Sequence, residues 1–388
     1  MKNNIAQKLH HSGDMGVSFG CLNCPERELC GGLRVSGDHY DCMAFCVCED
    51  PSSCELACPN NLPVYIARHQ EVRGFSFDNV PRTQVLSVGD LPPSVPVIYH
   101  ASKRVGALRT EAVAIPLSYL FNRKTGALRF ASREEIAENF GFEETARLVI
   151  LGVDQDDRIE DYWALRLAAR TPDRLAALSP DLITVPNFSL PLDVIRYDNL
   201  HNLKRIALCW SELMLAGIPT ALHVNARTDR DWERWIEFIV ERKEVKAVSF
   251  EFATGPARPE WGKWYASKLV ELGIAVPRHM QLITRGGYAY LPILRSAFSN
   301  VVFIDSSSFM KTIKRKKLVL EPGKQPRWID ARTRPREHLD ALLQENVEAS
   351  MKLIVRDNPA IAADVNIDSI LSERVSRHGL INLTPLRP

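Results

Sequence analysis

The chain has 388 residues, and 49 basic against 47 acidic side chains give it a formal net charge of +2. Hydrophobic residues make up 45% and charged residues 25%, a composition that is typical of globular proteins and excludes a disordered chain, a collagen-like fibre and a coiled coil. Apolar runs such as Leu148–Val153 are far shorter than the roughly 20 residues of a membrane span, and the first residues lack the apolar core of a signal peptide. We therefore expect a cytoplasmic protein without membrane contact.

Cysteines are concentrated near the start of the chain, where eight of the nine lie between residues 21 and 58. They are Cys21, Cys24, Cys30, Cys42, Cys46, Cys48, Cys54 and Cys58. Reduced cysteines at this density are typical of metal ligands, and eight ligands match two sites of four. A C-x2-C pair favours zinc, whereas the irregular spacing and the final Cys58-Pro59 favour an iron–sulfur cluster, and both remain open. We expect residues 1–60 to bind this metal or cluster for a structural purpose.

A proline-rich connector is predicted over 61–94, and beyond it short apolar runs alternate with amphipathic stretches. The apolar runs predict strands at 95–100, 113–118, 148–153, 182–187, 219–225, 245–252, 279–285 and 301–305. The clearest helices are predicted at 158–170, 197–216, 229–242, 260–272 and 288–298, with Asp229 as an N-cap and Gly273 beyond the last turn of its helix.

Eight strands that alternate with helices predict an α/β fold, a (β/α)8 TIM-like barrel over 95–335. An open, doubly wound parallel sheet is the alternative. Asn122–Gly126 predicts a hairpin-like turn in the irregular first units. Residues 336–388 are expected to form a helical extension, with helices around 338–355 and 367–376.

In a barrel of this kind the chemistry lies at the carboxyl ends of the strands. The polar residues at those positions are His100, Asp154, Asp156, Asp157, Asn187, His223, Asn225, Glu251, Arg285 and Asp305. Asp305 is the leading catalytic candidate because it ends a buried run and three serines follow it, although capping of the next helix would also explain it. Glu251 and Asp154 are the other catalytic candidates. A structural ion pair with Arg285 would also explain Glu251, and a solvated or capping turn would also explain Asp154.

Substrate binding is expected from Asn187, His223, Asn225, Arg285 and Gly286, although turn-forming or structural roles would also fit several of them. Residues 311–336 hold ten basic and two acidic side chains, a net charge of +8 that leaves −6 for the remainder of the chain. Such asymmetry is typical of a polyanion binder, although a solvated surface would also explain it. Lys314, Arg315, Lys316 and Lys317 are the candidates for phosphate contacts, and Trp328 is a candidate for base stacking.

The segment 283–317, with the sequence ITRGGYAYLPILRSAFSNVVFIDSSSFMKTIKRKK, resembles the last barrel units of the tRNA-guanine transglycosylase superfamily, including the branch that places 7-deazaguanines in DNA. The resemblance covers roughly 180–320 and implies that Asp305 is the nucleophile. Asn187 stands near the place of the family's second, base-like Asp. The family's C-terminal zinc ligands are missing, and the N-terminal cysteines are not part of its pattern.

The resemblance implies an enzyme that cleaves or exchanges a nucleobase at the N-glycosidic bond of a nucleic acid, with DNA favoured over RNA. Asn187 in place of a general base favours excision by water, as in a DNA glycosylase acting on modified phage bases. Two alternatives remain. One is a metal-dependent phosphodiester hydrolase that uses Asp154, His223, Glu251 and Asp305 as ligands. The other is a non-enzymatic DNA-binding protein of replication or regulation.

Overall fold

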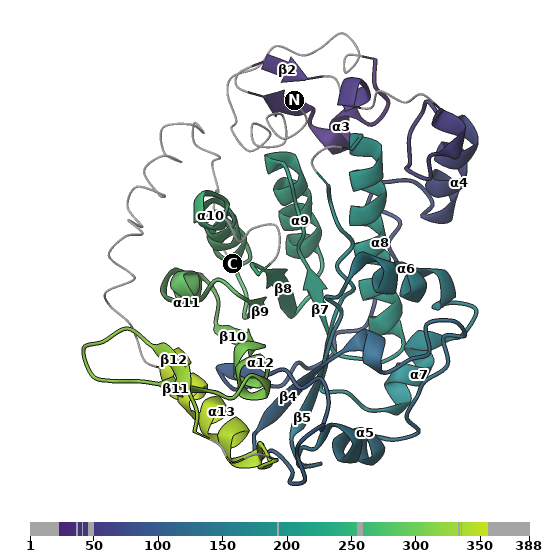
Figure 1. Ribbon diagram of the computed structural model, residues 1–388. Helices are drawn as coiled ribbons and strands as arrows, with labels where there is room; N and C mark the ends of the chain where they lie inside the picture. The colour runs from purple at the N-terminus through teal and green to yellow at the C-terminus, as the bar shows by residue number, and fades with distance from the viewer. Residues whose placement is uncertain are drawn as a thin grey trace, which may run out of the picture.

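The computed structural model describes residues 23–35, 38–40, 42–45, 50–191, 194–253, 259–332, 334 and 336–355. Its centre is a barrel of eight parallel strands in the order β3-β10-β9-β8-β7-β6-β5-β4 (Figure 1). The strands are β3 (Ser94–Pro96), β4 (Ala112–Pro116), β5 (Arg147–Leu151), β6 (Leu182–Thr184), β7 (Thr220–His223), β8 (Ala247–Glu251), β9 (Gln281–Arg285) and β10 (Asn300–Asp305). All eight predicted strands are present.

The ring of strands closes through β3. This strand pairs with β10 on one side, with Ile304 opposite Val95. On its other side Val97 forms a parallel bridge to Ala114, just beyond the end of β3. Closure of the sheet confirms the TIM-like barrel and excludes the open doubly wound alternative.

Helices alternate with the strands and cover the outside of the barrel. They are α5 (Arg133–Phe140), α6 (Asp156–Leu165), α7 (Thr171–Ala177), α8 (Arg196–Leu215), α9 (Asp229–Glu241), α10 (Pro259–Ala275), α11 (Leu291–Ala297) and α12 (Ser307–Ile313). The predicted hairpin-like turn is also present, since Phe121 and Leu128 pair in antiparallel fashion across it.

Two predicted helix ends were wrong. The N-cap of α9 is Thr228 rather than Asp229, because the Thr228 hydroxyl accepts from the Asp231 amide while the Asp231 carboxylate accepts from the Thr228 amide. Gly273 lies inside α10, which continues to Ala275. A Cβ at Gly273 would stand 2.7 Å from the Ala297 carbonyl oxygen, so the glycine lets α10 approach α11 closely.

Small and branched apolar side chains fill the barrel interior. They are Val95, Val97, Ala112, Ala114, Val149, Leu151, Leu182, Ala221, Ala247, Ile283, Val302 and Ile304. Because side chains alternate along a strand, these residues define the inward-facing positions. The inward residues that follow them toward the carboxyl ends are polar, so the polar side chains of the barrel interior gather at that mouth, where the active sites of such barrels lie.

The N-terminal part of the structure packs on the barrel at the start of two helices. Helix α3 (Arg27–Cys30) and the antiparallel hairpin of β1 (Leu33–Val35) and β2 (Asp38–Tyr40) lie at the top of Figure 1, beside α8 and α9. Arg230 donates from Nε to the Glu28 carbonyl oxygen at 3.1 Å. Since α8 and α9 begin after strands β6 and β7, this part lies on the same side of the barrel as the carboxyl ends of the strands.

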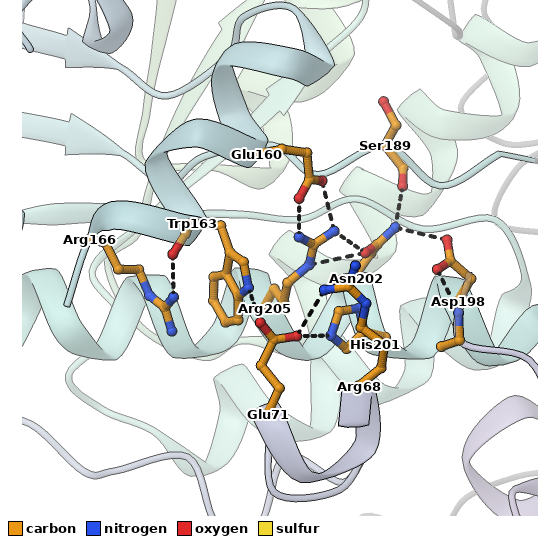
Figure 2. A network of polar contacts seen from close by, with 11 residues as sticks. Arg68, Glu71, Glu160, Trp163, Arg166, Ser189, Asp198, His201, Asn202 and Arg205 are labelled. Carbon is orange, nitrogen blue, oxygen red and sulfur yellow. Dashed lines mark hydrogen bonds and ion pairs between the residues drawn. The ribbon is translucent and has the colours of Figure 1, made fainter. Parts of the chain in front are cut away.

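Helix α4 (Leu62–Glu71) falls within the predicted connector, and a network of polar contacts ties it to the barrel helices (Figure 2). The Glu71 carboxylate accepts from Trp163 Nε1 at 2.7 Å and pairs with His201 Nε2 at 3.0 Å. Beside this carboxylate, the Arg205 guanidinium donates two hydrogen bonds to the Glu160 carboxylate, at 2.6 and 2.9 Å. The network therefore joins α4, α6 and α8 through charged groups.

Beyond α12 the chain forms an antiparallel hairpin of β11 (Lys316–Val319) and β12 (Arg327–Asp330), followed by helix α13 (Asp340–Val355). Helix α13 contacts α12, β11 and β3, and it corresponds to the helix expected around 338–355. The helix expected at 367–376 lies outside the described residues. Within the described residues, no helix is both long and apolar enough to cross a membrane.

Candidate active site at the barrel mouth

Glu251 and Arg285 form the central charged pair of the barrel mouth. They are direct partners in the register of β8 and β9, and Arg285 Nε lies 2.6 Å from Glu251 Oε2. The other carboxylate oxygen accepts from the Ala253 amide at 2.7 Å. Glu251 is buried, and this burial raises its pKa although Arg285 acts to lower it. A raised pKa extends to higher pH the range in which the carboxyl group holds a proton that it can donate.

His223 lies on the neighbouring strand β7, with its ring fully buried. Its Nδ1 is 3.3 Å from Ser249 Oγ, and its ring stacks on that of Phe250. Burial, together with the positive charge of Arg285, lowers the pKa of His223 to about 3. The imidazole is therefore neutral at physiological pH, so His223 can serve there as a hydrogen-bonding group but not as a cation.

Asp154 approaches the mouth from the carboxyl end of β5. Its carboxylate accepts from the Ser118 hydroxyl and pairs with Arg158 at 3.2 Å. The guanidinium of Arg158 also lies 5.9 Å from the centre of the Tyr119 ring. Asp154 is thus held by the ends of β4 and β5 rather than placed in a free solvated turn.

Tyr99 follows β3 at a position that shares the inward direction of Val95 and Val97 and so faces the barrel mouth. Burial raises the pKa of Tyr99, Arg285 lowers it, and Tyr119, Asp154 and Glu251 raise it further. Asp154 and Glu251 come from strands separated by β6 and β7. Tyr99 therefore lies within electrostatic range of charged groups on both sides of the mouth.

Asn187 and Asn225 are also brought together, but they bind each other. Asn225 Nδ2 donates to Asn187 Oδ1 at 2.9 Å and to the Phe188 carbonyl oxygen at 3.0 Å. The backbone carbonyl of Asn225 accepts in turn from Trp235 Nε1 at 2.7 Å. The pair therefore fixes the loops after β6 and β7 to each other at the edge of the mouth.

The backbone conformation and the close packing at Gly286 both require glycine. Its φ is +74°, and a Cβ there would lie 2.8 Å from the Ala253 amide nitrogen. The loop after β9 can therefore approach the loop after β8, which holds the Glu251 carboxylate. Gly286 shapes the site through this contact.

Asp305 faces away from the mouth. Val302 and Ile304 point into the barrel. Because side chains alternate along a strand, the next residue, Asp305, lies on the outer face of β10. Its carboxylate accepts from the amides of Ser307 and Ser308, at 2.8 and 3.2 Å, and from the Ser308 hydroxyl. Ser308 Oγ is also 3.2 Å from the Asn346 carbonyl oxygen of α13. The structure thus gives Asp305 the helix-capping role that the sequence left as its alternative.

The basic segment forms α12 and the β11–β12 hairpin. Ion pairs engage several of its side chains: Lys316 with Asp330 at 2.5 Å and Lys317 with Glu345 at 2.8 Å. Arg315 donates to the Glu337 carbonyl oxygen at 3.3 Å. Lys314 is exposed at the end of α12. Lys311 Nζ lies 5.9 Å from the centre of the Trp328 ring. The surface is therefore basic but partly neutralised.

Three of the predicted metal ligands meet in one small cavity. Cys24, Cys30 and Cys42 line a space of about 20 Å³ together with Arg196, Tyr197 and Leu200. Cys54 and Cys58 do not line this space, and Cys21, Cys46 and Cys48 lie outside the described residues.

Several residues of the mouth were missed by the sequence analysis, namely Tyr99, Ser118, Tyr119 and Arg158. The reading from strand ends selected His100, whose ring instead packs edge-on against Phe309. Val95 and Val97 point inward, and alternation along the strand would have identified Tyr99 as the next inward-facing residue. Tyr119 and Arg158 follow their strands in short helical turns, where alternation no longer gives the direction of a side chain.

Comparison with known proteins identifies no relative from which a function could be inferred. No protein family matches the chain, and no curated protein is significantly similar to it.

Proposed function

We propose that the barrel mouth cleaves or exchanges a nucleobase at the N-glycosidic bond of a nucleic acid, with DNA favoured over RNA. The observation that carries the proposal is the presence of two carboxyl groups with different partners at the barrel mouth: Glu251 is buried against Arg285, and Asp154 is bound by Ser118 and Arg158. Glycosidic cleavage typically uses two carboxyl groups in different environments. The resemblance of residues 283–317 to the tRNA-guanine transglycosylase superfamily supports the same reaction class.

The two carboxyl groups receive different roles. Glu251, with its raised pKa, donates a proton to the departing base as the bond from C1′ to the base nitrogen breaks. The Asp154 carboxylate faces the positive charge that develops on the sugar and takes the proton of the water that adds to C1′. Neutral His223 and the Tyr99 hydroxyl hydrogen-bond the base or the sugar.

The substrate must reach this mouth with its base out of the stack. Tyr99 and Tyr119, whose ring centres are 6.1 Å apart, offer aromatic faces for the extruded base. The basic surface formed by Lys311, Lys314 and the β11–β12 hairpin supplies phosphate contacts, with Trp328 beside it. Asp305 has a structural role in this proposal, in contrast to the nucleophile that the resemblance implies.

The test measures free base and abasic sites released from DNA that carries 7-deazapurine or hypermodified bases. We expect Glu251→Gln and Asp154→Asn each to lower the rate by about 10³-fold or more, since each removes a proton donor or a charge that acts in the transition state. Asp305→Asn is the matched carboxylate control and is expected to stay within about tenfold of the wild-type rate. Loss of release in Asp305→Asn alone would return the catalytic role to Asp305. Absence of release by the wild type from any modified substrate would refute the proposal.

A further inference from the structure

The cavity lined by Cys24, Cys30 and Cys42 lies where α3 meets the first turn of α8. Cys30 and Cys42 are buried, and Cys24 is half-buried. These three cysteines come from separate segments, namely the residue run before α3, the end of α3 and the turn at Cys42–Phe45. The fold therefore brings together thiols from three consecutive local elements.

Polar and cationic groups line the same cavity as the three sulfurs. The Cys24 sulfur lies 3.0 Å from the Tyr197 hydroxyl. Arg196, only 3% exposed, lines the same cavity and pairs with Asp231 through one terminal nitrogen at 2.6 Å. Among the described residues its buried Nε has no hydrogen-bond partner. The cavity also adjoins the N-terminus of α8, a helix of 20 residues, so a guanidinium and the positive end of a helix dipole both lie beside the sulfurs.

We propose that Cys24, Cys30 and Cys42 are ligands of one thiolate-bound metal centre, either a zinc ion or an iron–sulfur cluster, seated on the first turn of α8. Each thiol releases its proton to solvent as its sulfur binds the metal. Within the part of the chain that the structure describes, no three donor side chains are already placed to hold a metal ion, so the proposal requires the three thiols to turn toward one another on binding. Arg196 and Tyr197 then hydrogen-bond the coordinated sulfurs.

This centre also braces the barrel mouth. The Asp231 carboxylate that pairs with Arg196 accepts from the amides of Arg227 and Thr228, at 2.9 and 3.1 Å. Arg227 in turn donates from Nε to the Leu190 carbonyl oxygen at 2.6 Å. The metal centre is therefore linked through Arg196 and Asp231 to the loops after β6 and β7. The metal orders the edge of the mouth without contacting the reacting groups.

The experiment uses the full chain purified without oxygen. Zinc, iron and acid-labile sulfide are measured per chain, and a visible spectrum distinguishes an iron–sulfur cluster from colourless zinc. We expect Cys24→Ser, Cys30→Ser and Cys42→Ser each to lose the metal of one centre, and all three to lose the same kind. Cys209→Ala is the matched control, because Cys209 is a buried thiol in the middle of α8, away from the cavity, and it should keep the wild-type metal content.

A second measurement covers variants that fail to fold. In the wild type, a chelator should expose at least three additional thiols to a thiol reagent, while far-ultraviolet circular dichroism follows the barrel. A wild type that holds neither zinc nor iron, a Cys30→Ser variant with full metal content, or thiol reactivity unchanged by chelation would each overturn the proposal. All these readouts are independent of base release, so this proposal and the proposed function can fail separately.

Discussion

Glu251 and Arg285 face each other across β8 and β9, and their side chains meet at 2.6 Å inside the barrel mouth. Register pairing of two inward positions brings the charges together, and burial raises the pKa of Glu251 in spite of its cationic partner. The strength of this pair should therefore set the pH range in which the carboxyl group can donate a proton.

The pH dependence of base release tests this role. A proton donor is active below its pKa, so the rate should fall as pH rises through the raised pKa of Glu251. Arg285→Gln removes the charge that lowers this pKa, and the falling limb should move to higher pH by about one pH unit or more. Arg170→Gln, at an exposed arginine, is the control and should leave the limb in place. A limb that moves to lower pH in Arg285→Gln would contradict the assignment.

Asp305→Ala should act on stability rather than on chemistry. The Asp305 carboxylate accepts from the Ser307 and Ser308 amides at the start of α12, so loss of this acceptor should lower the free energy of unfolding by about 1–2 kcal/mol. Asp330→Ala removes an exposed carboxylate paired with Lys316 and should cost less than about 1 kcal/mol. Urea unfolding at pH 7 compares the two variants. Equal stability of Asp305→Ala and the wild type would refute the capping role.

Glu71 links stability to pH. Burial opposes its ionisation, but hydrogen bonds from His201 and Trp163 prevail and lower its pKa from 4.5 to about 2 (Figure 2). A lowered carboxyl pKa stabilises the fold fully above pH 4.5, and this contribution disappears as pH falls toward 2. Because the carboxylate is about one-third exposed, we expect Glu71→Gln to cost about 1–2 kcal/mol at pH 7 and progressively less below pH 4.5.

Urea unfolding of the wild type and Glu71→Gln at several pH values measures this difference. Glu111→Gln, at an exposed glutamate, is the control and should follow the wild type throughout. A difference between the wild type and Glu71→Gln that stays constant from pH 7 to pH 3 would show that the Glu71 charge does not stabilise the fold.

The basic surface can be tested by the salt dependence of DNA binding. Lys314 is exposed, and Lys311 adjoins Trp328, so the double change Lys311→Ala and Lys314→Ala should reduce the slope of log affinity against log salt by about 1–2. Lys243→Ala alters an exposed lysine between α9 and β8, at the opposite end of the barrel, and should leave the slope unchanged. Equal slopes for the double variant and the wild type would remove this surface from the interface.

The sequence by itself determined the barrel. Eight apolar runs separated by amphipathic stretches predict parallel strands and covering helices, because buried strands are apolar on both faces and the helices need one apolar face each. Helix ends were less certain. The N-cap of α9 moved by one residue to Thr228, since the capping box depends on side-chain hydrogen bonds that the periodicity does not contain.

Only the tertiary structure decided which strand-end residues share the mouth. Asp305 ends its strand as Glu251 does. In β10, however, it is Ile304 that points into the barrel, so the Asp305 side chain points outward to the start of α12. Tyr99 comes within electrostatic range of Glu251 and Asp154 because closure of the barrel brings β3 next to β10 and β4. Closure also brings the first turn of α8 to Cys24, Cys30 and Cys42. These contacts join residues far apart along the chain, and a local pattern cannot encode them because each depends on how every intervening element packs.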